Sequence, residues 1–411
     1  MTQFTPFDAD ERALARALHG KVDQMNDAPV GLAEVTSRAQ VIRCRRRVVV
    51  AASLTAAAVV VVPMAVLAGG ALRPDATPPV SSPSPTPSAE VMLPATMPFD
   101  LANVPTGEPP AVDYAEGSTI HAADGRTVEV GGVAGIDELA AMGDGWVAAV
   151  SDNSGNREAV RIGPDGAVSD RVPLDGSLAI SSAGSVVAWA GPDGSVTVVE
   201  SDGAETLKMP PITAPGPYSA VAVTSEDCVE GRSSDAGCAV IVNTSGQRQQ
   251  VYQSTSHGDV DVLPGFTKVT AYRGLTAGIT RVRFDTTACS RVVAPTDGSA
   301  LWRSCDLQIP SLSPLAKHAV AWSSQSDGLG ASDLALVTAT RGDPVFHLIS
   351  DEDHQVTVLQ TTWEDDSHVL AEVYFDGQWG VLRVGAARTL DWAIPPVSGG
   401  DVDPPYALQL R

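Results

Sequence analysis

The sequence predicts an all-β fold, a seven-bladed β-propeller, carried on a single transmembrane helix with a short helical cytoplasmic tail. Three observations lead to this prediction. An uncharged run of 25 residues, 48–72, follows a cluster of arginines. Asp-Gly pairs recur between short Val-, Ile- and Ala-rich runs, and similar runs return every 34 to 50 residues. Four regions follow: a tail over 1–47, a span over 48–72, a stalk over 73–98 and a propeller over 99–411.

The run at 48–72 is long enough to cross a membrane as a helix. Roughly 20 apolar residues, each rising about 1.5 Å, cover the hydrocarbon core, and only a helix satisfies its own backbone groups in lipid. Arg43 and Arg45–Arg47 flank the N-terminal end, whereas only Arg73 follows closely. The positive-inside rule therefore places 1–47 in the cytoplasm and 73–411 outside the cell membrane. The alternative is a cleaved signal peptide, whose n-region would be unusually long.

The sequence of the tail, residues 1–47, predicts weakly helical structure. Residues 8–27 carry acidic side chains in the first turn of a predicted helix, and Leu14 and Leu18 share one face. This arrangement resembles the N-termini of actinobacterial single-pass membrane proteins, some encoded beside sigma factors, and that resemblance implies a signalling or anti-sigma-like alternative. The zinc-binding anti-sigma subfamily is excluded, because His19 and Cys44 lie 25 residues apart and the tail has no second cysteine.

A proline-rich stalk follows the span. Residues 73–98 contain eight prolines among many serines and threonines. Such a composition favours an extended chain of up to about 3.1 Å per residue rather than a packed core. We therefore expect the exterior domain to stand some distance from the membrane.

The charge differs in sign on the two sides of the span. Residues 1–47 hold eight basic and six acidic side chains, so the 27 basic and 49 acidic side chains of the chain leave 19 and 43 for the remainder. The exterior net charge of −24 argues against binding nucleic acid, because the electrostatic contribution would be repulsive. Solubility alone is sufficient to explain this acidity.

The five cysteines separate by compartment. Cys44 lies on the predicted inner side, whereas the other four lie outside, where disulfides persist. Three pairings exist in principle, and proximity in the sequence favours Cys228–Cys238 and Cys289–Cys305. A zinc site is disfavoured, since neither pair has close C-x-x-C spacing.

Repeated apolar segments predict the blades. Six segments are predicted to form the same inner strand of successive blades, beginning at Trp146, Val186, Ala220, Val269, Ala319 and Val369. A period of 40–50 residues with several strands per unit is typical of propellers. Residues 112–130 would supply a seventh unit, completed by the last strand at Tyr406–Leu410, which removes an exposed sheet edge. The alternatives are six or eight blades, or a pair of β-sandwiches.

The domain resembles the TolB-type and WD-repeat-like propellers of secreted actinobacterial proteins. The segments that carry this resemblance are Ala319–Ser323, Ser332–Gly342 and Thr362–Leu370. It implies a propeller fold, but propellers host enzymes, binders and scaffolds alike, so it implies no activity. The Arg-rich, Lys-poor composition also resembles that of actinobacterial proteins.

Two acidic clusters are the candidate metal sites. Asp351 and Asp353 belong to one, and Asp365 and Asp366 to the other, each followed by a histidine. The sequence indicates no cofactor, except that calcium, which binds to hard carboxylate oxygens of this kind, is a candidate at these clusters. Neither cluster matches a calcium loop, and carboxylates at turns are usually solvated. No catalytic residue is identified, because the sequence lacks a Gly-x-Ser-x-Gly elbow, a nucleotide fingerprint and a His-Glu-x-x-His motif.

The leading functional hypothesis is a non-enzymatic binding or scaffolding protein of the cell envelope. A large exterior domain held off the membrane by a stalk suits recognition of an envelope protein or glycan. One alternative is a calcium-dependent propeller hydrolase that uses the acidic turns. Another is transmembrane signalling through residues 1–47.

Overall fold

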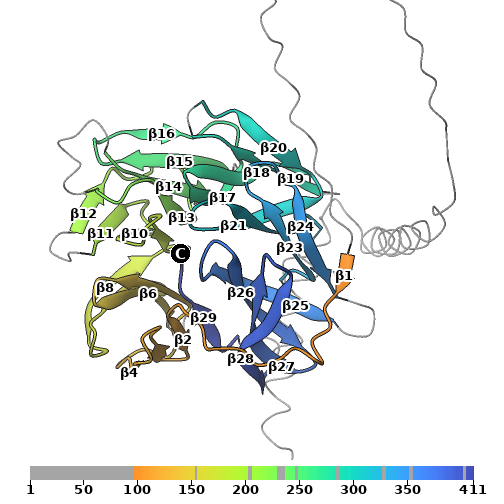
Figure 1. Cartoon of the computed structure of the whole chain (residues 1–411). Coiled ribbons are helices and arrows are strands. Elements are labelled where there is room, and N and C mark those ends of the chain that lie inside the picture. Colours follow the sequence, from red (N-terminus) through yellow and green to blue (C-terminus); the bar gives the residue numbers. More distant parts are fainter. Residues whose placement is uncertain are drawn as a thin grey trace, which may run out of the picture. The chain divides into compact units, whose positions relative to one another are not determined.

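The computed structural model shows seven β-sheets arranged in a ring (Figure 1). The structure describes residues 96–152, 155–201, 206–228, 237–245, 249–283, 287–295, 297–325, 330–350, 355–400 and 404–411. The predicted tail, the predicted span and most of the predicted stalk lie outside these residues. Within them the chain forms strands and turns, and no helix there is long and apolar enough to cross a membrane.

Each sheet is one blade with a core of four antiparallel strands, and the chain builds the blades in order. The strands of the first four blades, from the inner to the outer edge, are β29 (Tyr406–Leu408), β2 (Tyr114–Glu116), β3 (Thr119–His121) and β4 (Thr127–Glu129) in blade 1; β5 (Glu138–Met142), β6 (Gly145–Ser151), β7 (Arg157–Ile162) and β8 (Val168–Leu174) in blade 2; β9 (Ala179–Ile180), β10 (Val186–Ala190), β11 (Val196–Glu200) and β12 (Thr206–Met209) in blade 3; and β13 (Tyr218–Val223), β14 (Ala239–Thr244), β15 (Gln250–Thr255) and β16 (Val260–Val262) in blade 4.

The remaining blades follow the same order, and blade 6 gains a fifth strand. Their strands are β17 (Lys268–Arg273), β18 (Leu275–Arg283), β19 (Thr287–Val293) and β20 (Ala300–Ser304) in blade 5; β21 (Leu307–Leu312), β22 (His318–Ser323), β23 (Asp333–Thr338), β24 (Pro344–Ile349) and β1 (Thr96–Pro98) in blade 6; and β25 (Val356–Trp363), β26 (His368–Phe375), β27 (Gln378–Gly385) and β28 (Thr389–Ser398) in blade 7. The predicted number of seven blades is therefore confirmed.

The last strand closes the ring, as the sequence predicted. Strand β29 pairs antiparallel with β2, with Ala115 opposite Ala407. The pairing continues beyond the strand, because the backbone N–H of Gln409 donates to the carbonyl of Asp113 at 3.0 Å. Blade 1 thus combines the segment that contains β2, β3 and β4 with the last strand, and β29 covers the edge that β2 would otherwise expose.

The segment that precedes blade 1 runs along the outer edges of blades 6 and 7, seen in orange in Figure 1. Strand β1, the last three residues of the predicted stalk, pairs parallel with β24. Further on, Trp392 of β28 exchanges backbone hydrogen bonds with Pro105 and Gly107, at 2.8 and 3.0 Å. Arg383 fixes the same segment by donating to the carbonyl of Pro109 at 3.0 Å. These contacts cover two outer strands that would otherwise present free edges.

The prediction that six apolar segments form equivalent inner strands is wrong. The segments at Ala220 and Val269 lie in the inner strands β13 and β17, whereas the other four lie in the second strands β6, β10, β22 and β26. A second strand has a hydrogen-bonded neighbour on each side and buries both faces between blades, as the fully buried β10 shows. The sequence of a second strand is therefore a continuous apolar run. Inner strands border the channel and contain polar residues such as Thr361 and Thr362.

Most of the Asp-Gly pairs that the structure describes form hairpin turns between neighbouring strands of one blade, as their recurrence in the sequence predicted. Asp376 and Gly377 join β26 to β27 with φ values of 45° and 74°, the left-handed conformation that a two-residue hairpin needs. Asp175–Gly176 differs, because it connects blade 2 to blade 3. There a Cβ on Gly176 would lie 2.4 Å from the carbonyl of Tyr218, so the close approach requires glycine. The pairs at 202 and 327 lie outside the described residues.

Candidate ligand site in the central channel

A cavity of about 150 Å³ lies in the central channel of the propeller. Its walls come from the inner strands β9, β13, β17, β21 and β25, mainly from their C-terminal ends, together with residues 409–411. Each of these strands is followed by the turn that joins the first and second strands of its blade, which we call the first turn. The cavity therefore lies at the end of the channel where those first turns gather.

Side chains of the inner strands hold the channel wall together. Thr270 Oγ1 of β17 donates to the carbonyl of Ile309 in β21 at 2.5 Å. Thr362 Oγ1 of β25 likewise donates to the carbonyl of Gln409 at 2.5 Å. An inner strand has no sheet neighbour on its channel side, so its backbone groups need other partners. Polar residues in these strands supply them, and this explains why the inner strands are less apolar than the second strands.

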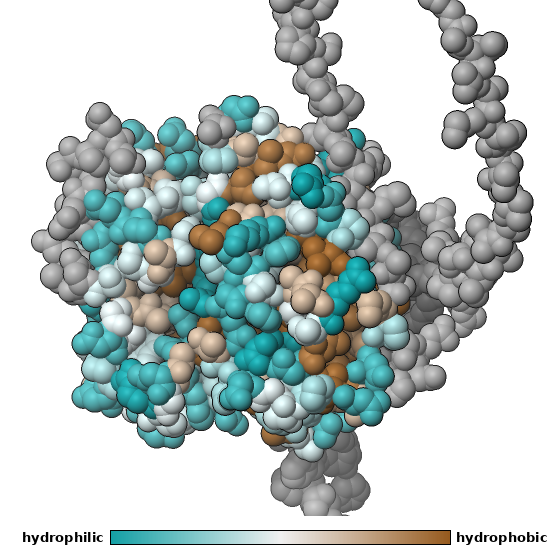
Figure 2. Space-filling model, in the orientation of Figure 1, coloured by the Kyte–Doolittle hydropathy of each residue, from teal (hydrophilic) through white to brown (hydrophobic). Residues whose placement is uncertain are grey.

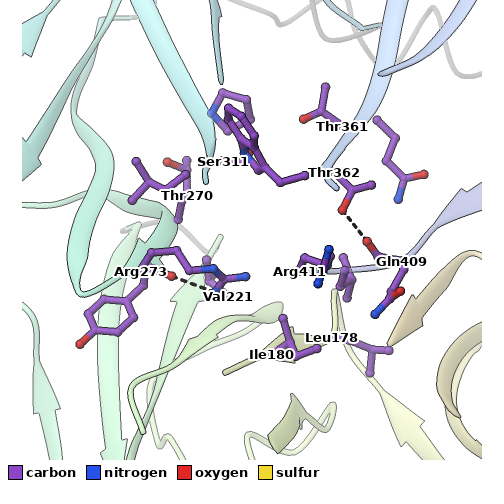
Figure 3. Close-up of a pocket in the computed structure, with 17 residues that line it drawn as sticks. Leu178, Ile180, Val221, Thr270, Arg273, Ser311, Thr361, Thr362, Gln409 and Arg411 are labelled. Atoms are coloured by element: carbon purple, nitrogen blue, oxygen red, sulfur yellow. Dashed lines mark hydrogen bonds between the residues drawn. The ribbon is translucent and has the colours of Figure 1, made fainter. Parts of the chain in front are cut away.

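Arg273 places a positive charge in the cavity wall (Figure 3). It is the last residue of β17, and its Nη1 donates to the adjacent carbonyl of Tyr272 at 3.0 Å. Its Nε is buried without a hydrogen-bond partner. Burial lowers the pKa of Arg273 to about 10; the carboxylate of Glu226 opposes this shift and the charge of Arg411 adds to it. The side chain still carries its proton at neutral pH.

Arg411 provides a second guanidinium on another side of the same cavity (Figure 3). It follows β29, and its Nη1 donates to the carbonyl of Glu364 in the turn between β25 and β26. The Glu364 carboxylate does not neutralise it, because that group pairs with Arg383. Two like charges thus line one small space, and the charge of Arg411 contributes to the lowered pKa of Arg273.

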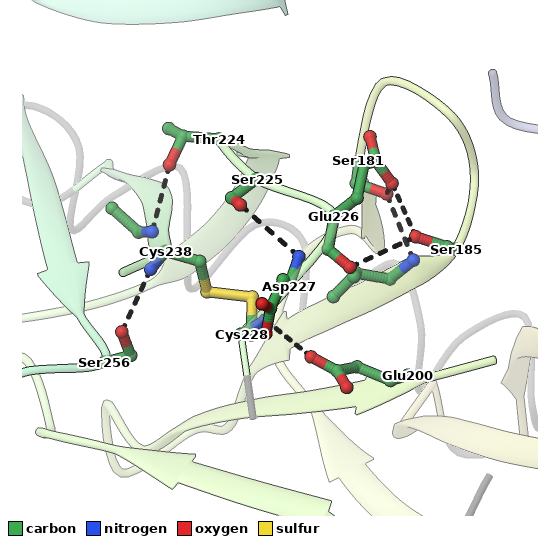
Figure 4. Close-up of a disulfide and its surroundings, with 12 residues drawn as sticks. Ser181, Ser185, Glu200, Thr224, Ser225, Glu226, Asp227, Cys228, Cys238 and Ser256 are labelled. Atoms are coloured by element: carbon green, nitrogen blue, oxygen red, sulfur yellow. Dashed lines mark hydrogen bonds between the residues drawn. A yellow bond between two sulfur atoms is a disulfide. The ribbon is translucent and has the colours of Figure 1, made fainter. Parts of the chain in front are cut away.

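Glu226 is the acidic residue that influences Arg273, and its oxygens are already occupied (Figure 4). Ser181 and Ser185 donate their hydroxyls to Oε2, and the backbone N–H of Ala183 donates to Oε1 at 2.6 Å. Burial alone would raise the pKa of Glu226, but these hydrogen bonds outweigh it and lower the pKa. Glu226 therefore joins blade 4 to the first turn of blade 3 as a carboxylate.

The two candidate metal ligands that the structure describes hold a turn together. Asp365 accepts hydrogen bonds from the backbone N–H of Ser367 at 2.6 Å and from His368 Nδ1 at 2.9 Å. Asp366 accepts the N–H of Leu315 at 2.7 Å and lies 3.3 Å from Lys317 Nζ. Within the described ranges, no group of three or more His, Cys, Asp or Glu side chains is placed to hold a metal ion.

The other two candidate ligands, Asp351 and Asp353, lie outside the described residues. The calcium site therefore stays a prediction. Both predicted disulfides are confirmed: Cys228 bonds to Cys238 (Figure 4), and Cys289 bonds to Cys305.

The channel arginines were missed at the level of sequence. Arg273 follows directly on the segment at Val269 that was recognised as an inner strand. A charged residue that directly follows the uncharged segment Val269–Tyr272 is a usable signal, because the end of an inner strand lies beside the channel. Arg411 gave no comparable signal, since its position depends on the closure of blade 1.

The strand order defines the class of this protein as a seven-bladed β-propeller. No protein-family model matches the chain, and no curated protein matches it. Among solved structures, it is similar to the β-propeller domain of Myceliophteria thermophila Cps50 (Swd1). That likeness has a TM-score of 0.44 and 10% sequence identity, and it covers 64% of this chain and 87% of that domain.

Proposed function

We propose that this chain is a membrane-anchored, extracytoplasmic binding protein that recognises an envelope protein or glycan. The anchor in this proposal is the uncharged run at 48–72, and the orientation follows from the arginines before it. A β-propeller suits a binding or scaffolding role, because a rigid ring presents turns from every blade on one face. The partner would bind where the first turns of the blades surround the central cavity.

The observation that carries this proposal is the combination of a cavity and an exposed apolar residue at the same end of the channel. Leu315, in the turn between β21 and β22, is 72% exposed, whereas most large apolar side chains of the domain are buried. Its backbone N–H is held by Asp366 of the neighbouring blade, which fixes the turn. Figure 2 shows hydrophilic residues around the middle of the drawn face, with apolar residues in separate small patches. An exposed apolar side chain on a fixed turn, at the same end of the channel as the cavity, gives a partner apolar surface to bury.

Site-specific crosslinking on intact cells tests the proposal. A photoreactive residue replaces Leu315 in the full chain, and a second variant carries it at the exposed Asp193 in the turn between β10 and β11, at the opposite end of the blades. We expect one defined envelope product from position 315 and none from position 193. Equal products from both positions, or none from either, would contradict a binding face at the first turns.

The predicted topology has its own test. Alkaline washing of membranes should leave the chain in the membrane fraction, and protease added to intact cells should remove the domain at 99–411 but spare residues 1–47. Release of the whole chain by washing would contradict the anchor.

A further inference from the structure

We propose that the central channel binds a small carboxylate between the guanidinium groups of Arg273 and Arg411. This inference rests on the proposed binding function and names the chemical group that the channel receives. The group would belong to the partner, as an acidic side chain or a sugar acid.

Unused hydrogen-bond donors are the first argument. A guanidinium carries five N–H groups, and Arg273 uses one of them on the carbonyl of its own neighbour, Tyr272. The Nε of Arg273 is fully enclosed and makes no hydrogen bond. Neither Arg273 nor Arg411 forms an ion pair with a carboxylate in the part of the chain that the structure describes. Arg411 is exposed, but Arg273 is partly buried, and a partly buried charge without a partner is costly, so an anion that paired with Arg273 would be favoured.

The occupied state of Glu226 is the second argument. Glu226 attracts Arg273 electrostatically and opposes the fall in its pKa, but Glu226 forms no ion pair with Arg273 among the described residues. Instead its two oxygens accept from Ser181, Ala183 and Ser185, which hold it in the turn between β9 and β10. The channel charge therefore stays available for a ligand.

The size and the lining of the cavity are the third argument. A cavity of about 150 Å³ is comparable to one that holds benzene in another protein, so a carboxylate with a few carbon atoms fits. Ser311 and Thr361 add uncharged hydroxyls to the wall (Figure 3). Ser311 Oγ accepts the indole N–H of Trp363 at 3.1 Å, so its hydroxyl hydrogen is left to donate. Charged and neutral donors thus converge on one space.

Charge favours a carboxylate over a phosphate. The guanidinium fork matches both groups, since each offers two oxygens in suitable geometry. However, the chain outside residues 1–47 has a net charge of −24, and its repulsion grows with the charge of the ligand. A singly charged carboxylate therefore meets less repulsion than a doubly charged phosphate.

Calorimetric titration of the purified full chain in detergent tests the site, with sodium acetate and sodium phosphate as probes at constant ionic strength. We expect saturable acetate binding that weakens about tenfold to a hundredfold in Arg273→Gln and in Arg411→Gln, because a hydrogen bond to a charged group contributes about 1.5–3 kcal/mol. Arg341→Gln is the matched control, because Arg341 is 71% exposed and pairs with Asp343 in another turn. Its affinity for acetate should equal that of the unaltered chain.

Three outcomes would overturn the inference. These are acetate binding no stronger than that of chloride, acetate binding that survives in Arg273→Gln, and phosphate binding in place of acetate. Arg273→Lys guards against a variant that fails to fold, since it keeps the charge and loses the fork, and its acetate affinity should be intermediate. Crosslinking at Leu315 without acetate binding would remove the carboxylate site and leave the proposed function standing. Acetate binding without crosslinking at Leu315 would support the carboxylate site and contradict the proposed function.

Discussion

The side-chain amide of Gln360 holds both backbone groups of Leu408. It accepts the N–H of Leu408 at 3.1 Å and donates to its carbonyl at 3.2 Å. Gln360 lies in the inner strand of blade 7 and Leu408 in the closing strand of blade 1, so the amide replaces a missing sheet neighbour at the junction that closes the ring. Asn243 does the same for Val269 between blades 4 and 5, at 2.9 and 2.8 Å.

Replacing the closing amide should loosen this junction. We expect Gln360→Ala to lower the free energy of unfolding by about 1–3 kcal/mol, because two buried backbone groups lose their partner. Equilibrium unfolding in urea measures the effect. Gln325→Ala is the control, because Gln325 is exposed and should change stability by less than about 0.5 kcal/mol. Equal stability of the two variants would show that the amide is not needed for closure.

A buried acid at the same junction predicts a pH dependence. Glu372 of β26 is 1% exposed and accepts the backbone N–H of Tyr406 at 3.2 Å. Burial raises the pKa of Glu372 from 4.5 to about 8, although the hydrogen bond from Tyr406 opposes the shift. The folded state therefore keeps a proton that the unfolded state loses. Its contribution to stability is full below about pH 4.5, falls as the pH rises, and is lost by about pH 8.

Glu372→Gln isolates this contribution. Glutamine keeps an acceptor for Tyr406 and does not titrate, so the variant should gain stability relative to the unaltered chain between pH 5 and pH 8. Thermal unfolding across that range measures the difference. Glu116→Gln, at an exposed position of β2, should follow the unaltered chain. Parallel pH profiles for the chain and Glu372→Gln would show that the acid is not protonated in the folded state.

A buried histidine and aspartate form a pair inside blade 6. His347 Nε2 is 2.8 Å from Asp333 Oδ2, and the two side chains are 3% and 5% exposed. Asp333 also accepts the backbone N–H of Ser323, so it joins three strands of the blade. We expect Asp333→Ala to lower the free energy of unfolding by about 3–5 kcal/mol, because it leaves buried polar groups without hydrogen-bond partners.

The exposed pair Arg341–Asp343 offers a matched comparison in the same blade. Asp343→Ala should cost at most about 1 kcal/mol, because water screens an exposed ion pair. Urea unfolding of both alanine variants gives the contrast. A similar loss in the two variants would mean that the burial of Asp333 adds nothing to its contribution.

The number of blades and both disulfides could be predicted from local patterns in the sequence, and the closure followed from counting the strands. Turn pairs such as Asp376–Gly377 and the short spacing of the cysteines need no knowledge of distant residues. The position of a strand within its blade, inner or second, could not be predicted, because both kinds of strand can be rich in Val and Ala. The channel site could not be predicted either, since Arg273 and Arg411 are 138 positions apart and line one cavity only once the ring is closed. Buried polar side chains such as Glu372 resemble surface residues until their neighbours are known.

The two disulfides predict how the chain reacts with thiol reagents. Cys228–Cys238 and Cys289–Cys305 account for four of the five cysteines, which leaves Cys44 beside the arginines before the predicted span. Alkylation of chain taken from cells and unfolded without reductant should therefore modify one cysteine, and reduction beforehand should raise the count to five. Mass spectrometry gives both counts.

The same experiment reports on the compartment of the domain. Disulfides persist outside the cytoplasm and are reduced within it, so five modified cysteines before reduction would place the propeller in the cytoplasm. Cys289→Ala/Cys305→Ala should also lower the free energy of unfolding, by about 3 kcal/mol, since the bridge restricts the unfolded chain. A membrane-impermeant alkylating reagent supplies the remaining control. On intact cells it should leave Cys44 unmodified if residues 1–47 lie inside, and modification there would reverse the predicted orientation.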